Sequence, residues 1–459
     1  MTGGSAGNGG STSAGGAGGS SDASVSDSAT PAAIWDWTGI VGTGQSLSVG
    51  TPPTTSVMQP YHNLKLSLGS LGNSIAPPFD PNDAALSMIP LVEPVRPLAT
   101  TFPEAYPGNL YGETPHTAMA NQISFLVRQS SPNLDFVSVH TVVGESGQGI
   151  VALKKNAPPP NPPLAAPMSM ARAYAATIFE ATAIARLAHV AGKSYGVGVV
   201  VMTHGETDSG SSTYKNDLIQ LLSDYNADLA TITGQTQKIP MYISQQHAFP
   251  NGVGSAGQRP LANIVQWQLG VDHKGDFVCT GPKYQYPANS SNDGVHLSAV
   301  GYQLLGEKTA QVYYERALLG HDWQPLQPMS ADRSGRVVTV HFHVPTSPLN
   351  WDEMIDPPSP TALNGVWANG RGFELRAGAT NIAISSVTIS GDTVQITAGA
   401  DLPATGLTVG YALTSQGVQM VAASKAVRWG QLRDSDPFVG QTTKIANPNY
   451  CVSFEMAVP

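Results

Sequence analysis

The sequence predicts a three-layer α/β domain built on an open parallel sheet, followed by a smaller all-β domain. From Trp35 to about Pro325, apolar runs of strand length alternate with longer segments of helical period. This alternation favours parallel strands with helices on both faces of the sheet. After Pro325 the apolar runs have period 2, and no helical segment interrupts them. The length of 459 residues also exceeds that of one ordinary domain.

The expected strands of the α/β domain are short and buried. They cover 37–44, 134–144, 195–205, 239–246 and 276–281. The run YGVGVVVMTHG at 195–205 is too apolar for a half-exposed strand, so it fits the centre of a parallel sheet. The expected helices cover 115–130, 168–191, 214–232, 258–269 and 298–318. Thr114 is the expected N-cap of the first helix and Pro115 its first residue, whereas the proline-rich segment 156–167 must be a loop.

The period-2 runs predict the strands of the second domain. They cover 337–344, 386–398 and 406–413. The middle run folds back at Gly391-Asp392, which is typical of a hairpin turn. We therefore expect a β-sandwich over 325–459, behind an α/β domain over 31–324. Residues 1–30 are almost purely Gly, Ser, Ala, Thr and Asn and cannot bury enough apolar surface to fold, so we expect a disordered tether.

The composition excludes some partners and favours an extracellular location. Only 12% of the residues are charged, about half the usual share. The net charge of −9 repels phosphate backbones, which argues against a nucleic-acid partner. No stretch approaches the roughly 20 apolar residues that span a bilayer. The hydroxyl-rich surface and the tether suit a secreted or surface-tethered bacterial-type protein, but Met1 is followed directly by Thr-Gly-Gly-Ser. Either a signal segment has been removed, or the protein is not exported.

We expect no metal site at the two cysteines or at the histidine pair His341 and His343. Cys279 and Cys451 are too few for a disulfide framework or a four-ligand zinc site. They either pair with each other or are buried separately. His341 and His343 share one face of an expected strand at a spacing compatible with zinc, but without a third clustered ligand a solvated strand face is the better interpretation.

Three groups of polar residues follow expected strands, at the edge where open α/β sheets bind ligands. Ser46, in the block GQS, lies on a turn after the first strand, and the block HGETD at 204–208 follows the central one. Asp293 and His296 lie three residues apart before the last helix. There the histidine can accept the serine proton, while the aspartate holds the imidazole in the required tautomer. Taken singly, each residue has a structural alternative. Ser46 could be an ordinary turn serine, Asp293 could form an Asx turn, and His296 could pack at the start of the helix.

The order and spacing of these blocks resemble the SGNH (GDSL-type) hydrolases. The matching blocks are GQS at 44–46, HGETD at 204–208 and DGVHLS at 293–298, with a glycine after the strand 134–144. Within that superfamily, the first two are most similar to carbohydrate esterases related to sialate O-acetylesterases and plant-type acetyl xylan esterases. The resemblance covers about 36–318 and implies a flavodoxin-like three-layer sheet.

The resemblance implies a role for each matching residue. Ser46 is the expected nucleophile, and its backbone N–H forms an oxyanion hole with that of Gly144. Asp293 and His296 complete the catalytic set. Where these esterases usually have a glutamine as a further oxyanion donor, this chain has His204. An imidazole can also donate a hydrogen bond, and a purely structural role at the strand end is equally open.

Four further polar residues are candidates for substrate contact or for supporting the site: Gln45, Glu113, Glu206 and Asp208. For Glu206 and Asp208, we favour hydrogen bonds to the backbone that order their loop over proton transfer. Glu113 precedes the helix 115–130, where capping or interaction with the helix dipole is the default interpretation.

These observations predict a serine esterase that removes O-acetyl or other short acyl groups from a carbohydrate through an acyl-enzyme intermediate. The first alternative is a broader carboxylesterase, lipase-like or polyester hydrolase, for which the insertion between Ser46 and Tyr111 would build a wide groove. The second is a glycan-binding surface protein without activity. The expected chemistry requires no metal and no organic cofactor. The sequence leaves open the ester, the sugar, the oligomeric state, any anchor and the role of the β-domain.

Overall fold

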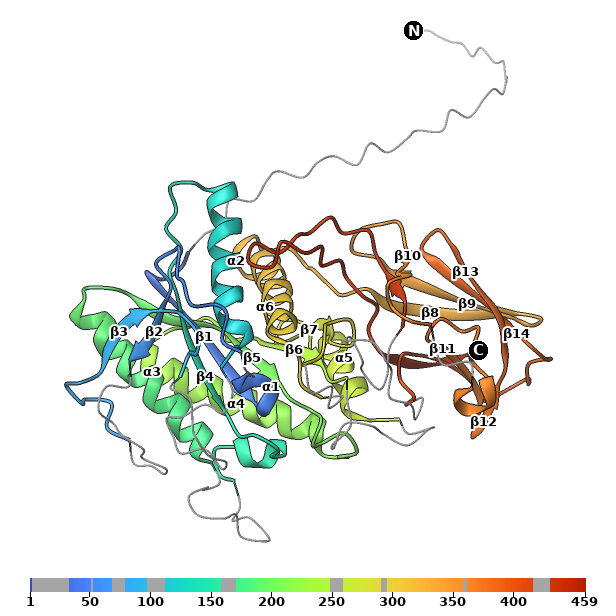
Figure 1. The fold of residues 1–459 in the computed structure, drawn as a ribbon, viewed down its shortest axis with the longest axis horizontal. Helices are drawn as coiled ribbons and strands as arrows, with labels where there is room; N and C mark the ends of the chain where they lie inside the picture. The colour runs from blue at the N-terminus through green and yellow to red at the C-terminus, as the bar shows by residue number, and fades with distance from the viewer. Residues whose placement is uncertain are drawn as a thin grey trace.

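The computed structural model describes residues 1, 33–50, 53–67, 79–96, 112–157, 171–247, 259–289, 295–357, 361–415 and 430–459. It contains a mixed α/β part with a central sheet and, beside it, a part made of antiparallel strands (Figure 1). No helix among the described residues is long and apolar enough to cross a membrane.

The central sheet has seven strands and is parallel except at one edge. They are β1 (Trp37–Gly44), β2 (Leu64–Ser67), β3 (Ser87–Pro90), β4 (Ser138–Gly144), β5 (Tyr195–Thr203), β6 (Met241–Gln245) and β7 (Phe277–Pro282). Their order is β3-β2-β4-β1-β5-β6-β7, and only β2 and β3 pair antiparallel. If that hairpin is left out, the remaining order is β4-β1-β5-β6-β7. Renumbered along the chain, these five strands have the order 2-1-3-4-5 of flavodoxin-like folds. The expected fold class of this part is therefore confirmed.

Helices cover both faces of the sheet. They are α1 (Ser46–Val49), α2 (Pro115–Ser130), η1 (Ile150–Leu153), α3 (Arg172–Val190), α4 (Tyr214–Thr233), α5 (Ala262–Asp272), α6 (Ala299–Tyr313) and η2 (Tyr314–Leu318). Successive residues of a strand point to opposite faces. Thus Ile40 of β1 packs in a cluster with residues of α2 and α6, whereas Val41 packs with residues of α3, α4 and α5. Figure 1 shows α2 and α6 side by side on one face.

Local sequence signals set the helix starts. Thr114 caps α2, because its hydroxyl accepts a hydrogen bond from the N–H of His116 at 3.1 Å, and Pro115 is the first residue of that helix. Ser298 caps α6 in the same way, accepting from Gly301 N at 3.1 Å. Both helices therefore begin where the sequence predicts.

In the described residues of the C-terminal part, every regular element is a β-strand apart from the short turn η3 (Ala362–Gly365). Its strands are β8 (Gln327–Ser334), β9 (Val337–His343), β10 (Asn350–Trp351), β11 (Phe373–Ala377), β12 (Thr380–Ile382), β13 (Ile384–Ser390), β14 (Thr393–Ala398), β15 (Leu407–Tyr411), β16 (Leu432–Arg433) and β17 (Phe454–Val458). They form two four-stranded antiparallel sheets and a two-stranded ladder. Side chains from both four-stranded sheets share one hydrophobic cluster, consistent with the expected β-domain. The hairpin expected at Gly391-Asp392 joins β13 to β14.

The two parts pack against each other through apolar contacts. Trp267 of α5, Cys279 of β7 and Tyr284 belong to the same hydrophobic cluster as the strands of the β-domain. Cys279 and Cys451 are buried free thiols, so they are buried separately and are not joined by a disulfide. Burial raises the pKa of the Cys279 thiol to about 12, which keeps it protonated and unreactive.

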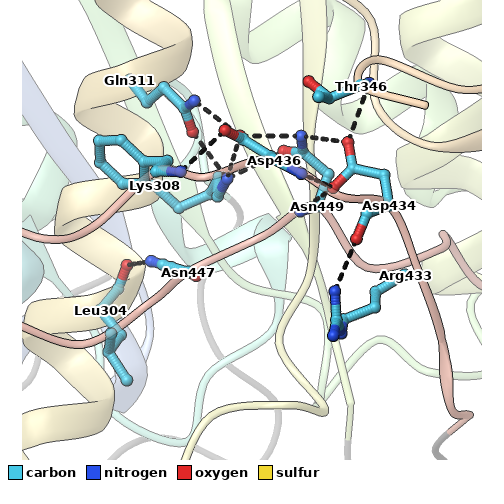
Figure 2. A network of polar contacts seen from close by, with 10 residues as sticks. Leu304, Lys308, Gln311, Thr346, Arg433, Asp434, Asp436, Asn447 and Asn449 are labelled. Atoms are coloured by element: carbon cyan, nitrogen blue, oxygen red, sulfur yellow. Dashed lines mark hydrogen bonds and ion pairs between the residues drawn. The ribbon is translucent and has the colours of Figure 1, made fainter. Parts of the chain in front are cut away.

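A network of polar contacts also connects the C-terminal segment that contains Asp434, Asp436 and Asn449 to α6 (Figure 2). The ammonium of Lys308, on α6, donates to Asn449 Oδ1 at 2.9 Å and lies 3.5 Å from a carboxylate oxygen of Asp436. Asp434 accepts from both the backbone and the side-chain N–H groups of Asn449. The C-terminal segment is therefore held on the α/β part by buried, hydrogen-bonded polar groups as well as by apolar contacts.

Candidate active site

The proposed catalytic serine and histidine meet at the carboxyl edge of the sheet. Ser46 follows the last residue of β1 by two positions and begins α1. His296 lies shortly before α6, 250 positions further along the chain. Ser46 Oγ and His296 Nε2 are 2.8 Å apart, within hydrogen-bonding distance. A nucleophile and a base at this distance are the minimum requirement of nucleophilic acyl transfer.

The turn that presents Ser46 depends on Gly44. This residue has φ of 148°, which L side chains rarely adopt. A Cβ atom at this position would lie 2.0 Å from the carbonyl oxygen of Thr203, at the end of β5. The next residue, Gln45, donates its backbone N–H to that same carbonyl at 3.2 Å. The end of β1 is therefore held against the end of β5, and the chain turns directly into the serine.

Apolar side chains next to the two reacting residues hold their segments together. Leu47 follows Ser46, and Leu297 follows His296; both are buried in one small cluster with Tyr286. The contact is non-local, so it fixes the relative position of segments that no local interaction could align. Asp293 lies outside the described residues, and its orienting role stays a prediction.

Gly144 lies beside the serine turn, as the oxyanion role requires. It pairs in register with Gly44, and the N–H of Glu145 donates to the Gly44 carbonyl at 2.9 Å. A Cβ atom on Gly144 would lie 2.8 Å from that carbonyl oxygen and 3.0 Å from a methyl group of Val49 in α1. Only glycine lets the two strand ends approach this closely. Its role as a donor to the oxyanion stays a prediction.

The geometry of His204 argues against its expected role as an oxyanion donor. The ring is fully buried, and its Nε2 lies 3.1 Å from the carbonyl oxygen of Gln148, to which it must donate. Its Nδ1 lies 3.2 Å from the hydroxyl of Tyr214. Burial also lowers the pKa of His204, which favours the neutral ring. With both nitrogens engaged, the imidazole has no N–H left for a substrate, and it instead holds the loop that follows β4.

The acidic residues near His204 also order loops. Asp208 accepts a hydrogen bond from the N–H of Ile150 at 2.6 Å, from the same loop after β4. Glu206 is buried and forms an ion pair with the fully buried Lys283 at 2.9 Å. Burial opposes its ionisation, but Lys283 and His247 lower the pKa of Glu206 below its usual value. The backbone contact of Asp208 is of the expected loop-ordering kind. Glu206 instead pairs with the side chain of Lys283, which follows another strand.

Gln45 and Glu113 are likewise engaged within the protein. Gln45 accepts from the N–H of Thr207 at 3.4 Å, a long contact that joins the serine turn to the segment after β5. Glu113 is fully buried and accepts from the backbone N–H groups of Thr55 and Ser56 at 2.7 and 3.0 Å. Its carboxylate thus fixes the loop after α1, while capping of α2 is left to the threonine that follows it. Neither a substrate-facing nor a capping role for Glu113 is supported.

Two buried charged groups at this edge were not expected from the sequence. Glu145 directly follows Gly144 and pairs with Arg172 of α3, and Lys283 directly follows β7. Both lie just beyond the carboxyl end of a strand, the position that singled out the other candidates. They were missed because no local motif indicates a partner that is distant in sequence.

The described residues contain no group of three His, Cys, Asp or Glu side chains that could hold a metal ion. His341 is instead 2.7 Å from the carboxylate of Asp332 on the neighbouring strand. A cavity of about 260 Å³ lies at the opposite, amino edge of the sheet, between Trp35, Tyr242 and Tyr313. Since Ser46 follows the carboxyl end of β1, that cavity does not belong to the candidate site.

Comparison with known proteins supports the fold. No family model matches the chain, and no curated protein sequence matches it. A carbohydrate acetylesterase from Xanthomonas citri is similar in structure, with a TM-score of 0.52 and 13% identity over 91% of this chain and 80% of that one. An Arabidopsis thaliana protein matches with a TM-score of 0.40 and 17% identity over 61% of this chain and 99% of its own. A carbohydrate acetylesterase from Sinorhizobium meliloti matches with a TM-score of 0.29 and 11% identity, over 60% of this chain and 97% of its own. The structural similarity to the Xanthomonas citri carbohydrate acetylesterase agrees with the expected fold.

Proposed function

We propose that this protein is a serine esterase that removes O-acetyl or other short acyl groups from a carbohydrate. The observation that carries the proposal is the 2.8 Å contact between Ser46 Oγ and His296 Nε2 at the carboxyl edge of the sheet. The motif order at 44–46, 204–208 and 293–298 and the shared fold support the carbohydrate-esterase branch.

The reaction would begin with attack of Ser46 Oγ on the ester carbonyl carbon, while His296 Nε2 accepts the hydroxyl proton. The negative charge that develops on the carbonyl oxygen requires preorganised donors. The N–H of Ser46 is suited to this role, because the first N–H groups of a helix have no partner within it. The N–H of Gly144 is the second expected donor.

The tetrahedral intermediate then collapses. The bond between the carbonyl carbon and the sugar oxygen breaks, and the imidazolium of His296 protonates the leaving hydroxyl. Water attacks the acetyl group on Ser46 with His296 again as base, which releases acetate and restores the serine. Asp293 is the residue we expect to hold the imidazole in the required tautomer.

The test is acetate release from a panel of acetylated polysaccharides by the parent protein and by Ser46→Ala. Release by the parent and none by the variant is the expected result, and the best substrate identifies the sugar. Aryl esters of increasing acyl length, assayed alongside, distinguish an acetylesterase from a lipase-like enzyme. If the parent releases nothing and leaves the aryl esters intact, the proposal fails and glycan binding becomes the hypothesis to test.

A further inference from the structure

We propose that the buried ion pair between Arg172 and Glu145 is a positioning device for the oxyanion hole, which holds the N–H of Gly144 at the serine. The inference rests on the proposed function. Glu145 is the residue directly after Gly144, and Arg172 is the first residue of α3. Their side chains are only 4% and 5% exposed.

Glu145 is held in place by contacts of its backbone N–H, its backbone carbonyl and its side-chain carboxylate. Its backbone N–H, in the peptide shared with Gly144, donates to the Gly44 carbonyl at 2.9 Å. Its own carbonyl accepts from the N–H of Gln148 at 3.2 Å, which closes the turn that follows β4. Its carboxylate accepts from Nε and Nη2 of Arg172, the second at 2.8 Å. The residue that follows the oxyanion glycine is therefore tied to the serine strand, to its own loop and to α3.

A bidentate guanidinium–carboxylate pair suits this task. Its two parallel hydrogen bonds fix both the distance and the orientation of the carboxylate, which a single point charge does not. Oxyanion donors act only at hydrogen-bonding distance from the developing charge, and a displacement of about 1 Å can cost on the order of a hundredfold in rate. A rigid anchor one residue away from the donor therefore affects the transition state more than the binding of the ester.

The chain contains a matched control. Arg96 and Glu180 form a second buried arginine–glutamate pair, with side chains 4% and 4% exposed. Glu180 also belongs to α3, eight residues after Arg172, or roughly 12 Å along the helix. It lies toward the amino edge of the sheet, where burial and, to a smaller extent, the charge of Glu180 raise the pKa of Tyr195 at the start of β5. The two pairs share residue types, burial and helix, and only one is next to Gly144. Their geometry differs, because Arg96 donates from both Nη1 and Nη2 to Oε1 of Glu180, at 2.8 and 2.6 Å.

The experiment compares Arg172→Lys with Arg96→Lys in the full chain. Lysine keeps the charge but gives up the two guanidinium hydrogen bonds that each arginine makes to its glutamate. We expect both variants to lower Tm by similar amounts. Only Arg172→Lys should lower kcat for an aryl acetate, by about ten- to a hundredfold, with KM changed less than about threefold. If Arg172→Lys does not fold, Glu145→Gln is measured against Glu180→Gln in the same way.

A second measurement separates loss of oxyanion stabilisation from general damage. The thiono analogue of the aryl acetate uses the same serine and histidine, but its sulfur accepts hydrogen bonds more weakly than oxygen. The ratio of kcat for the ester to kcat for the thionoester should therefore fall in Arg172→Lys and stay at the parent value in Arg96→Lys.

Equal losses of kcat in the two variants, or an unchanged ratio in Arg172→Lys, would show that the pair is only structural and overturn the inference. Failure of the proposed function looks different. In that case the parent itself shows no turnover that Ser46→Ala abolishes, and the inference falls with it.

Discussion

At the scale of single residues, the candidate site depends on glycines as much as on the reacting groups. Gly44 occupies a backbone conformation that other residues rarely adopt, against the carbonyl of Thr203. Gly144 has no space for a side chain between Gly44 and Val49. The two glycines allow the ends of β1 and β4 to lie close together, which brings the turn that carries Ser46 next to the loop after β4.

Gly44→Ala should therefore damage both stability and activity. The added Cβ would lie 2.0 Å from a backbone oxygen that cannot move freely. We expect a loss of at least about 3 kcal/mol in the free energy of unfolding, measured by urea denaturation, and an inactive folded fraction. The control is Gly210→Ala, since that Cβ meets nothing within 4 Å and the backbone is outside the left-handed region. Parent-like stability and turnover in Gly44→Ala would contradict the account of the turn.

At the scale of elements, a buried histidine pair joins α2 to β4. His116 Nδ1 and His140 Nδ1 are 3.0 Å apart, and His140 Nε2 is 3.0 Å from the hydroxyl of Ser138. That hydroxyl donates to Asn63, so it accepts from His140 Nε2. His140 Nδ1 must then accept from the Nδ1–H of His116, and both rings are neutral. Burial lowers the pKa of His116 to about 3 and that of His140 well below its usual value.

This pair makes stability depend on pH. In the unfolded chain both rings take up a proton near pH 6.5, whereas in the folded protein they stay neutral down to about pH 3. The unfolded state therefore binds more protons in this window, and stability falls as the pH falls through it. Each histidine contributes a slope of about 1.4 kcal/mol per pH unit.

His116→Asn should flatten that dependence, because the amide can still donate to His140 but does not titrate. We expect the slope between pH 6 and pH 4, measured by urea denaturation, to decrease by roughly 1.4 kcal/mol per pH unit. The exposed His62 provides the control substitution, His62→Asn. A slope that does not differ from that of the parent would mean that His116 titrates normally in the folded state.

The elements show what the sequence predicts well. The strands at 37–44 and 195–203 and the helix at 115–130 appear where composition and capping place them, because each has a strong local signal. The hairpin of β2 and β3 was missed, because these strands are only four residues long and lie in a proline-rich insertion. Strands of this length are stabilised by the neighbouring edge of the sheet, which the local sequence does not reveal.

The same distinction applies to the site. Ser46 and His296 could be predicted, because each belongs to a recognisable block after a strand. The engagement of both nitrogens of His204 could not, because its partners Gln148 and Tyr214 come from other segments. The ion pair of Glu145 with a helix 27 positions away escaped prediction for the same reason.

At the scale of the whole molecule, the β-domain packs against the α/β part as one structural unit. It shares a hydrophobic cluster with α5 and β7, and Gln245 at the end of β6 exchanges two hydrogen bonds with the backbone of Ser453, at 2.8 and 2.9 Å. Asp434 orients Asn449, which in turn accepts from Lys308 of α6 (Figure 2). We therefore expect the two parts to unfold together.

Asp434→Ala should lower the stability of both parts at once. The carboxylate accepts four hydrogen bonds, and its removal takes this partner from the buried backbone N–H of Asn449 and from three further N–H groups. The expected loss is about 3 kcal/mol or more, seen in calorimetry as a shift of one cooperative transition. Asp401→Ala, at an exposed surface pair, should change little. Two separate transitions, with only one of them shifted, would show that the domains fold independently.

The central claim is that Ser46 is a nucleophile activated by His296, and covalent labelling tests it most directly. A fluorophosphonate is incubated with the parent, Ser46→Ala and His296→Ala, and the intact mass and peptide map are recorded. The account predicts one adduct in the parent, located on Ser46, none in Ser46→Ala, and labelling slower by about a thousandfold or more in His296→Ala. Absence of labelling in the parent, or an adduct on another residue that persists in Ser46→Ala, would contradict it.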